Sequence, residues 1–133
     1  MREASFTVYY HRATQLANAM KLCRDGLSAY ASAAALLAVH SAISYSDAVL
    51  LGLDSKRPRG ENHQEAVTAL KRACSRARVD HQGIGHLQKL LSVKTDVSYG
   101  EKRVDDEKVE ALCIAAERFR VWAERILQKR EGR

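Results

Sequence analysis

The sequence has little of what a β-rich protein needs. Its 133 residues include 1 proline and 7 glycines, and aromatic residues make up only 6%. A sandwich or barrel of many short strands requires turn residues at short intervals, which this chain does not provide. Alanine, leucine, glutamate, lysine, arginine and glutamine dominate instead, and a chain of this length can bury a single core. The composition therefore predicts one all-α domain over residues 1–133.

Long apolar runs and paired cysteines are also missing. No stretch of about 18 consecutive apolar residues occurs, and the first residues lack the apolar segment of a signal peptide. The 3 cysteines, Cys23, Cys74 and Cys113, are widely spaced and form no Cys-x-x-Cys pair that would indicate a zinc or redox site. We expect a cytoplasmic protein without membrane contact, in which the cysteines are small buried side chains.

The positive charge of the chain is concentrated in its middle. The net charge is +6, and residues 1–55 and 104–133 are each neutral overall. Residues 56–103 carry eleven basic and five acidic side chains and so account for the whole excess. A segment of this kind is suited to holding a polyanion through its phosphates, although the solvated faces of helices are often basic as well.

Apolar residues at spacings of three and four predict five helices. They are expected at residues 5–24, 27–54, 63–78, 81–99 and from residue 105 onward. Pro58 and Gly60 interrupt the helical pattern, so residues 56–62 should form a basic loop. The second helix is rich in small residues and should be the central element. Five helices with short connections and no strand signal predict an up-and-down helical bundle.

Polar residues in the second helix mark a candidate site. His40, Ser44 and Asp47 are spaced to lie along one side of that helix. Asp47 could orient an imidazole, such as that of His63, if the second and third helices fold back on each other. A buried polar network that fixes the register of the helices explains the same spacing. A metal site would need three or four ligands that the sequence does not bring together, so no metal and no cofactor are expected.

Three segments stand in a recognisable order ahead of the last helix. They are AVHSAISYSDAVL at residues 38–50, RPRGENH at residues 57–63 and LLSVKTDVSY at residues 90–99. This order, which covers nearly the whole chain, resembles the HEPN family (higher eukaryotes and prokaryotes nucleotide-binding domain) of small helical bundles. The resemblance implies either a metal-independent ribonuclease or a binding partner of a small nucleotidyltransferase, often within a toxin–antitoxin system.

The resemblance also implies where a nuclease site would lie. Catalytically active HEPN proteins have an arginine followed, four to six residues later, by a histidine. Arg57 and His63 have five residues between them and meet this spacing, with Arg59 as a second cation. His63 would take the proton of the 2′-hydroxyl, and an arginine would stabilise the charge of the phosphorane. The alternative is a purely structural role, in which His63 begins the third helix and the arginines are solvated charges of the loop.

Two departures from the family pattern favour binding over cleavage. Pro58 follows Arg57 where the family usually has a polar residue, and Lys94 and Tyr99 replace arginine and histidine in the later segment where nucleases tend to carry the pair. Lys94 and Tyr99 could clamp a phosphate, or could be an ordinary helix-end lysine and a half-buried tyrosine.

The expected function is therefore a binding module in a toxin–antitoxin, stress or defence system. It would recognise a nucleotide, an RNA or a partner nucleotidyltransferase through Lys94, Tyr99, His40 and Asp47. The alternative is a metal-independent endoribonuclease that uses Arg57, Arg59 and His63. A helical assembly protein without a ligand is the third possibility. A homodimer is expected in each case, because many small helical proteins cover an apolar face by dimerising.

Overall fold

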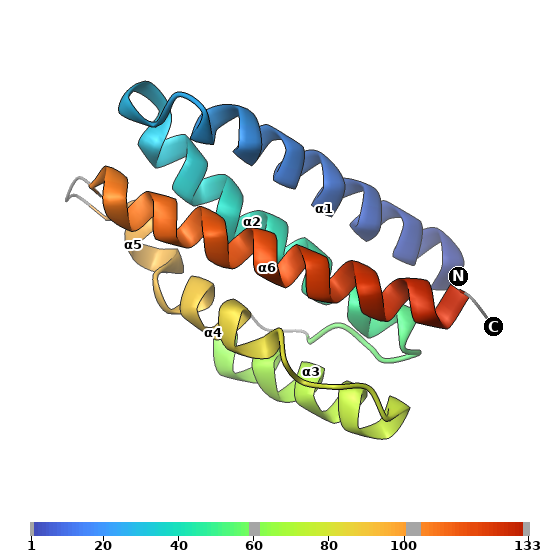
Figure 1. Cartoon of the computed structure of the whole chain (residues 1–133). Helices are drawn as coiled ribbons and strands as arrows, with labels where there is room; N and C mark the ends of the chain where they lie inside the picture. The colour runs from blue at the N-terminus through green and yellow to red at the C-terminus, as the bar shows by residue number, and fades with distance from the viewer. Residues whose placement is uncertain (1, 59–61, 101–104, 132–133) are drawn as a thin grey trace.

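The protein is a bundle of helices in the computed structural model, which describes residues 2–58, 62–100 and 105–131 (Figure 1). These residues form six helices and no strand: α1 (Arg2–Arg24), α2 (Leu27–Gly52), α3 (His63–Ala77), α4 (Ile84–Ser92), α5 (Lys94–Tyr99) and α6 (Asp106–Glu131). The predicted all-α bundle is confirmed. The number of helices is six rather than five, because the predicted helix over residues 81–99 is divided into α4 and α5.

Two local features divide that predicted helix. The turn before α4 passes so close to α6 that a Cβ atom on Gly83 would lie 2.4 Å from the ring of Trp122, so only glycine fits there without displacing the indole. Helix α4 therefore begins at Ile84, after this contact. At its other end, Val93 is partly buried against the core and has non-helical backbone angles (φ −108°, ψ 4°), which separate α4 from α5.

Helix α2 is the central element, as the sequence predicts. It packs most extensively against α1 and α6, and it also contacts α3, α4 and α5. Ala34, Ala35, Ala38, Ala42 and Ala48 are completely buried, and their small side chains let the neighbouring helices approach closely. By length and composition α2 could span a membrane, but 72% of its most apolar window is buried inside the bundle. Its apolar character is thus accounted for by the core.

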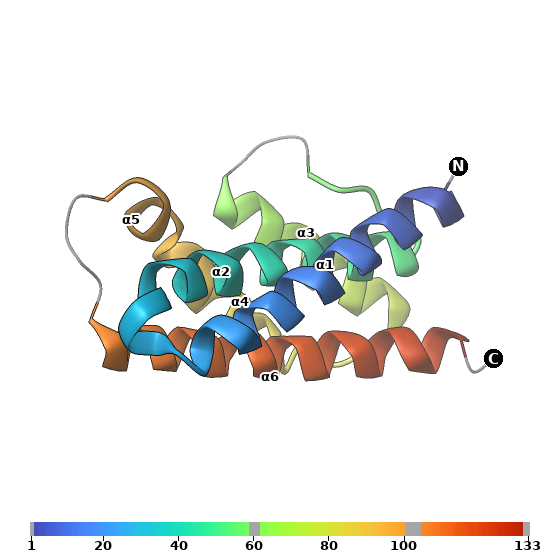
Figure 2. The ribbon, with the colours of Figure 1, turned by 90° about the horizontal axis from the view of Figure 1, so that it is seen from above.

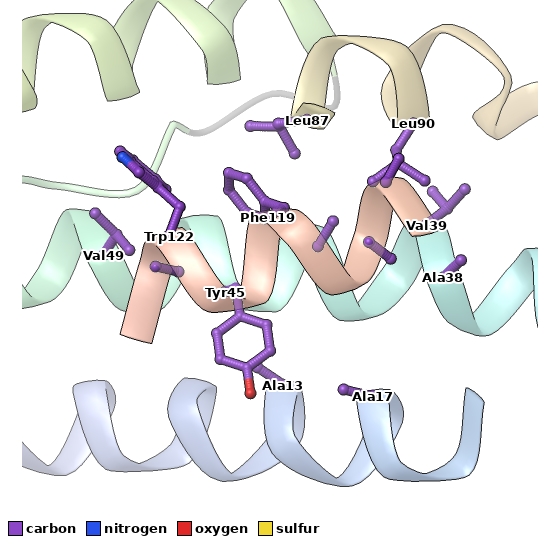
Figure 3. Packing of buried hydrophobic residues seen from close by; sticks show 14 of the residues in the cluster. Ala13, Ala17, Ala38, Val39, Tyr45, Val49, Leu87, Leu90, Phe119 and Trp122 are labelled. Carbon is purple, nitrogen blue, oxygen red and sulfur yellow. The ribbon is translucent and has the colours of Figure 1, made fainter. Parts of the chain in front are cut away.

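The core is filled from five helices, α1, α2, α3, α4 and α6. Figure 3 shows Tyr45 pointing from α2 toward α1, where it lies beside Ala13, and Phe119 pointing from α6 toward Leu87 of α4. Phe119 and Trp122 stack with ring centroids 5.5 Å apart. Cys74 and Cys113 are buried as expected, whereas Cys23 is half-buried. Burial raises the pKa of the two buried thiols to about 11, which keeps them protonated and inert.

A polar network crosses this core and ties three helices together. The hydroxyl of Tyr45 in α2 donates to Oε2 of Glu124 in α6 at 3.0 Å. Arg120 donates to the same carboxylate oxygen at 3.3 Å and to Oδ1 of Asn18 in α1 at 3.3 Å. Burial raises the pKa of Tyr45 to about 12, so its hydroxyl remains a donor.

The direction of α3 decides where the basic segment of the chain lies. Figures 1 and 2 show α3 running in the same direction as α2, because the chain returns along the bundle between them. The described part of this connection, up to Pro58, therefore lies over the end of α2 and the first half of α1. Arg57 reaches side chains of both helices from this position.

Candidate functional site

The polar residues predicted on α2 do lie along one side of that helix. We call His40, Ser44 and Asp47 the α2 polar stripe. It extends about 10 Å along the axis, since seven residues separate its ends and each contributes about 1.5 Å. Ser44 and Asp47 are buried, and His40 is half-buried. Each end of the stripe is approached by a basic residue from another part of the chain.

Arg57 covers the Asp47 end of the stripe. Its Nε atom lies 3.3 Å from Oδ2 of Asp47, and its guanidinium carbon lies 4.2 Å from the centroid of the Tyr9 ring in α1. A second guanidinium, that of Arg12, lies 5.2 Å from the same centroid. Burial raises the pKa of Asp47, while the positive charges of Arg57 and Arg12 act to lower it. For this carboxylate, the loss of hydration outweighs the attraction of the two arginines.

Lys94 approaches the His40 end of the stripe from α5. The pKa of His40 is lowered, first by burial and second by the positive charge of Lys94. His40 is therefore neutral at pH 7, and one of its ring nitrogens can accept a hydrogen bond. The stripe thus has Arg57 at its Asp47 end, and at its other end a neutral imidazole on which the charge of Lys94 acts.

Three of the seven predicted site residues therefore meet on one side of α2: His40, Asp47 and Arg57, which pairs with Asp47. The positive charge of Lys94, in α5, acts on His40. Tyr99 is not brought to them. It is 84% exposed, and five residues along a helix place it about 140° around the axis of α5 from Lys94. The structure does not bring Lys94 and Tyr99 together as the two halves of a clamp.

Of the residues predicted for a nuclease site, the structure describes the side chain of Arg57 alone. Arg59 lies outside the described residues, and so does the side chain of His63. The backbone at His63 begins α3, and the side chain of the preceding Asn62 accepts a hydrogen bond from the amide of Gln64 at 2.8 Å. The described contacts of Arg57 are with Asp47 and Tyr9, so a role for His63 stays a prediction.

Sequence reasoning missed two features of this region. One is the pair Tyr9 and Arg12, whose spacing of three residues on a helix was visible but carried no special meaning alone. The other is the contact between Arg76 of α3 and the hydroxyl of Ser55, to which Arg76 donates a hydrogen bond. This contact places the exposed basic side of α3, with Lys71 and Arg72, beside the segment that carries Arg57.

A second charged cluster lies on the turn before α4. Oδ1 of Asp80 accepts a hydrogen bond from Nε1 of Trp122 at 2.8 Å, and Oδ2 accepts one from Arg125 at 2.9 Å. The amide of Gln82 also donates to Oδ1, at 3.0 Å. The hydrogen bond from Arg125 is the largest of several causes that hold the pKa of Asp80 well below its usual range. All these partners belong to the chain itself, so this cluster anchors the turn to α6.

The comparisons with known proteins do not assign the site. No family model matches the chain, and no curated protein matches its sequence. Within the described part of the chain, no three histidine, cysteine, aspartate or glutamate side chains lie close enough together to hold a metal ion. The function therefore has to be argued from the cations and their surroundings.

Proposed function

We propose that this protein is an HEPN-like module that binds single-stranded RNA through phosphate contacts. The binding region would be the basic surface formed by Lys56, Arg57, Lys71, Arg72 and Arg76. The observation that carries the proposal is the hydrogen bond from Arg76 to Ser55, because it joins the basic side of α3 to the segment before Pro58. Residues about 20 positions apart in sequence thereby form one positive surface.

The charges on this surface are largely uncompensated. Lys56, Lys71 and Arg72 are exposed, and none of them forms an ion pair within the residues that the structure describes. Arg57 pairs with a single carboxylate, that of Asp47. Elsewhere in the bundle the basic side chains of Lys21, Arg24 and Arg120 are paired with glutamates of α6. An extended surface of unpaired cations favours a polyanion over a small neutral ligand.

Binding to a labelled single-stranded RNA of about 12 nucleotides tests the proposal. Reversing two charges on the basic surface, in the Lys71→Glu and Arg72→Glu double variant, should weaken binding at least about tenfold. The matched control is the Arg118→Glu and Lys129→Glu double variant, which makes the same change in net charge on exposed positions of α6. Affinity should also fall as salt rises, with a slope of about −0.7 for each phosphate contact.

Equal losses in the two double variants would mean that only the net charge matters, and no binding by the wild type would refute the proposal. Incubating the same RNA with the protein in excess EDTA separates binding from cleavage. Cleavage that is lost in a His63→Ala variant would replace the binding module with the endoribonuclease. Light scattering on the same samples tests the predicted homodimer, which stays a prediction, as does a nucleotidyltransferase partner.

A further inference from the structure

Arg57 has an unusual environment for a surface arginine. One side of its guanidinium meets Asp47, and the Tyr9 ring lies under it. The guanidinium of Arg12 contacts the same ring, with its carbon 5.2 Å from the centroid, so Tyr9 carries two guanidinium groups. Stacking on an aromatic ring fixes the orientation of a guanidinium, which reduces the entropy that it loses when it binds an anion.

The charges of this cluster do not balance. Two guanidinium groups face one carboxylate, and Arg12 makes no ion pair with any described residue. A phosphate group carries one or two negative charges and several acceptor oxygens, and arginine is the side chain that binds it with the best geometry. The cluster therefore matches a phosphate in both charge and donor type.

We propose that Tyr9, Arg12 and Arg57 form a binding site for one phosphate group, and that Asp47 holds Arg57 in place until a phosphate replaces its carboxylate. This inference rests on the proposed function, because the phosphate would be one of those along the bound RNA. To that function it adds a specific phosphate subsite that includes Tyr9 and Arg12 of α1. It also adds the carboxylate of Asp47 in α2, which competes with the phosphate for Arg57.

The geometry of the Asp47–Arg57 pair permits such an exchange. Nε of Arg57 lies 3.3 Å from one oxygen of Asp47, which is long for an ion pair with a charged hydrogen bond. The side chain of Arg57 is 43% exposed, whereas that of Asp47 is 12% exposed. Arg57 can therefore turn toward a phosphate in solvent while Asp47 remains in place. Burial already raises the pKa of Asp47, and the departure of Arg57 would remove a positive charge that lowers it.

A double-mutant cycle with the labelled RNA tests this exchange. Asp47→Asn removes the competing charge and should tighten RNA binding about threefold to tenfold, the size of a typical charged pair. When Asp47→Asn is added to the Arg57→Ala variant, the affinity for RNA should not change further, because Asp47 competes with RNA only for Arg57. Arg12→Ala should weaken binding about tenfold. Glu65→Gln, which makes the same charge change at an exposed position of α3, should have equal effects in both backgrounds.

A spectroscopic readout follows the carboxylate itself. In a ¹³C NMR titration, the pKa of Asp47 should rise when RNA is bound, because Arg57 no longer faces it. The exchange would be overturned if RNA bound without a change in the pKa of Asp47. It would also be overturned if Asp47→Asn changed the affinity for RNA equally with and without Arg57. Either result would leave the proposed function intact. If the wild type binds no RNA, inorganic phosphate replaces it in the titration. A rise in the pKa of Asp47 would then support the subsite alone, and its absence would refute it.

Discussion

Asp47 and Asp80 each face an arginine, yet their environments have opposite effects. At Asp80, hydrogen bonds from Arg125, Trp122 and a backbone amide stabilise the carboxylate and hold its pKa well below the usual range. At Asp47, burial raises the pKa in spite of Arg57. One carboxylate is fully satisfied by its own chain, whereas the other is desolvated and only partly compensated.

The difference separates a structural ion pair from one that is available for function. Arg125 is on α6, and its partner Asp80 lies in the turn before α4, so this pair anchors the turn to α6. Arg57 is on a segment between helices, stacks on Tyr9 and keeps much of its surface in solvent. Removing the first pair should therefore damage the fold, and removing the second should change binding.

Trp122→Ala should cause the largest loss of stability. It removes the buried indole that covers Gly83, the stacking on Phe119 and the hydrogen bond to Asp80. The free energy of unfolding should fall by about 3–5 kcal/mol, as for other large-to-small substitutions in cores. Urea denaturation measures it. The neighbouring Val121, which is 60% exposed, provides the control, since Val121→Ala should change stability by about 0.5 kcal/mol or less. Similar losses in both variants would contradict the anchoring role of the indole.

Asp80→Asn should destabilise the protein by about 1–2 kcal/mol at pH 7, because it removes the charge that Arg125 faces at a partly exposed site. The folded state lowers the pKa of Asp80, so its contribution is complete above about pH 4 and is lost as the pH falls toward the folded-state value. Wild type and variant should therefore converge in acid. Asp96→Asn, at an exposed position of α5, is the control and should change stability at pH 7 by about 0.5 kcal/mol or less. A difference that persists at low pH would show that the charge is not responsible.

Asp47→Asn should behave in the opposite way. The folded state raises the pKa of Asp47, so the ionised carboxylate costs stability above its folded-state pKa, and that cost disappears as the pH falls below about 4. The variant should be equal to the wild type or slightly more stable at pH 7, by about 1 kcal/mol or less, because the remaining Arg57 can be hydrated. Thermal unfolding at several pH values measures this. A loss as large as that of Asp80→Asn would show that Asp47 is a structural anchor.

The sequence could predict the parts of this contrast that depend on local patterns. Apolar spacing identified the helices, and the small residues of α2 identified the central one. The spacing of His40 and Asp47 placed both on one side of that helix. The break between α4 and α5 was missed, because it depends on the packing of Val93 against the core, where its backbone is not helical. The start of α4 was missed as well, because it depends on the contact of Gly83 with Trp122, which is 39 positions away in sequence.

The partners of the candidate site could not be predicted for the same reason. Arg57 was singled out for its spacing from His63, but its described partners are Asp47 and Tyr9, which lie in two other helices. That meeting depends on the path of the chain after α2, which returns along the bundle before α3 begins (Figure 2). Spacing within one helix predicts which residues share a face, whereas the chain path decides which cation covers that face.

The smallest expected effect lies at the other end of the α2 polar stripe. The positive charge of Lys94 contributes to the lowered pKa of His40, after the larger contribution of burial. Lys94→Ala should therefore raise the pKa of His40 toward its usual value without restoring it, because the burial remains. An NMR titration of the imidazole measures this, and Lys89→Ala, at an exposed position of α4, is the control. If the pKa of His40 does not respond to Lys94, the two side chains are too far apart to act on one ligand. A rise in the pKa of His40 that occurs in Lys94→Ala and not in Lys89→Ala would place Lys94 beside the imidazole, at the end of the stripe opposite Arg57.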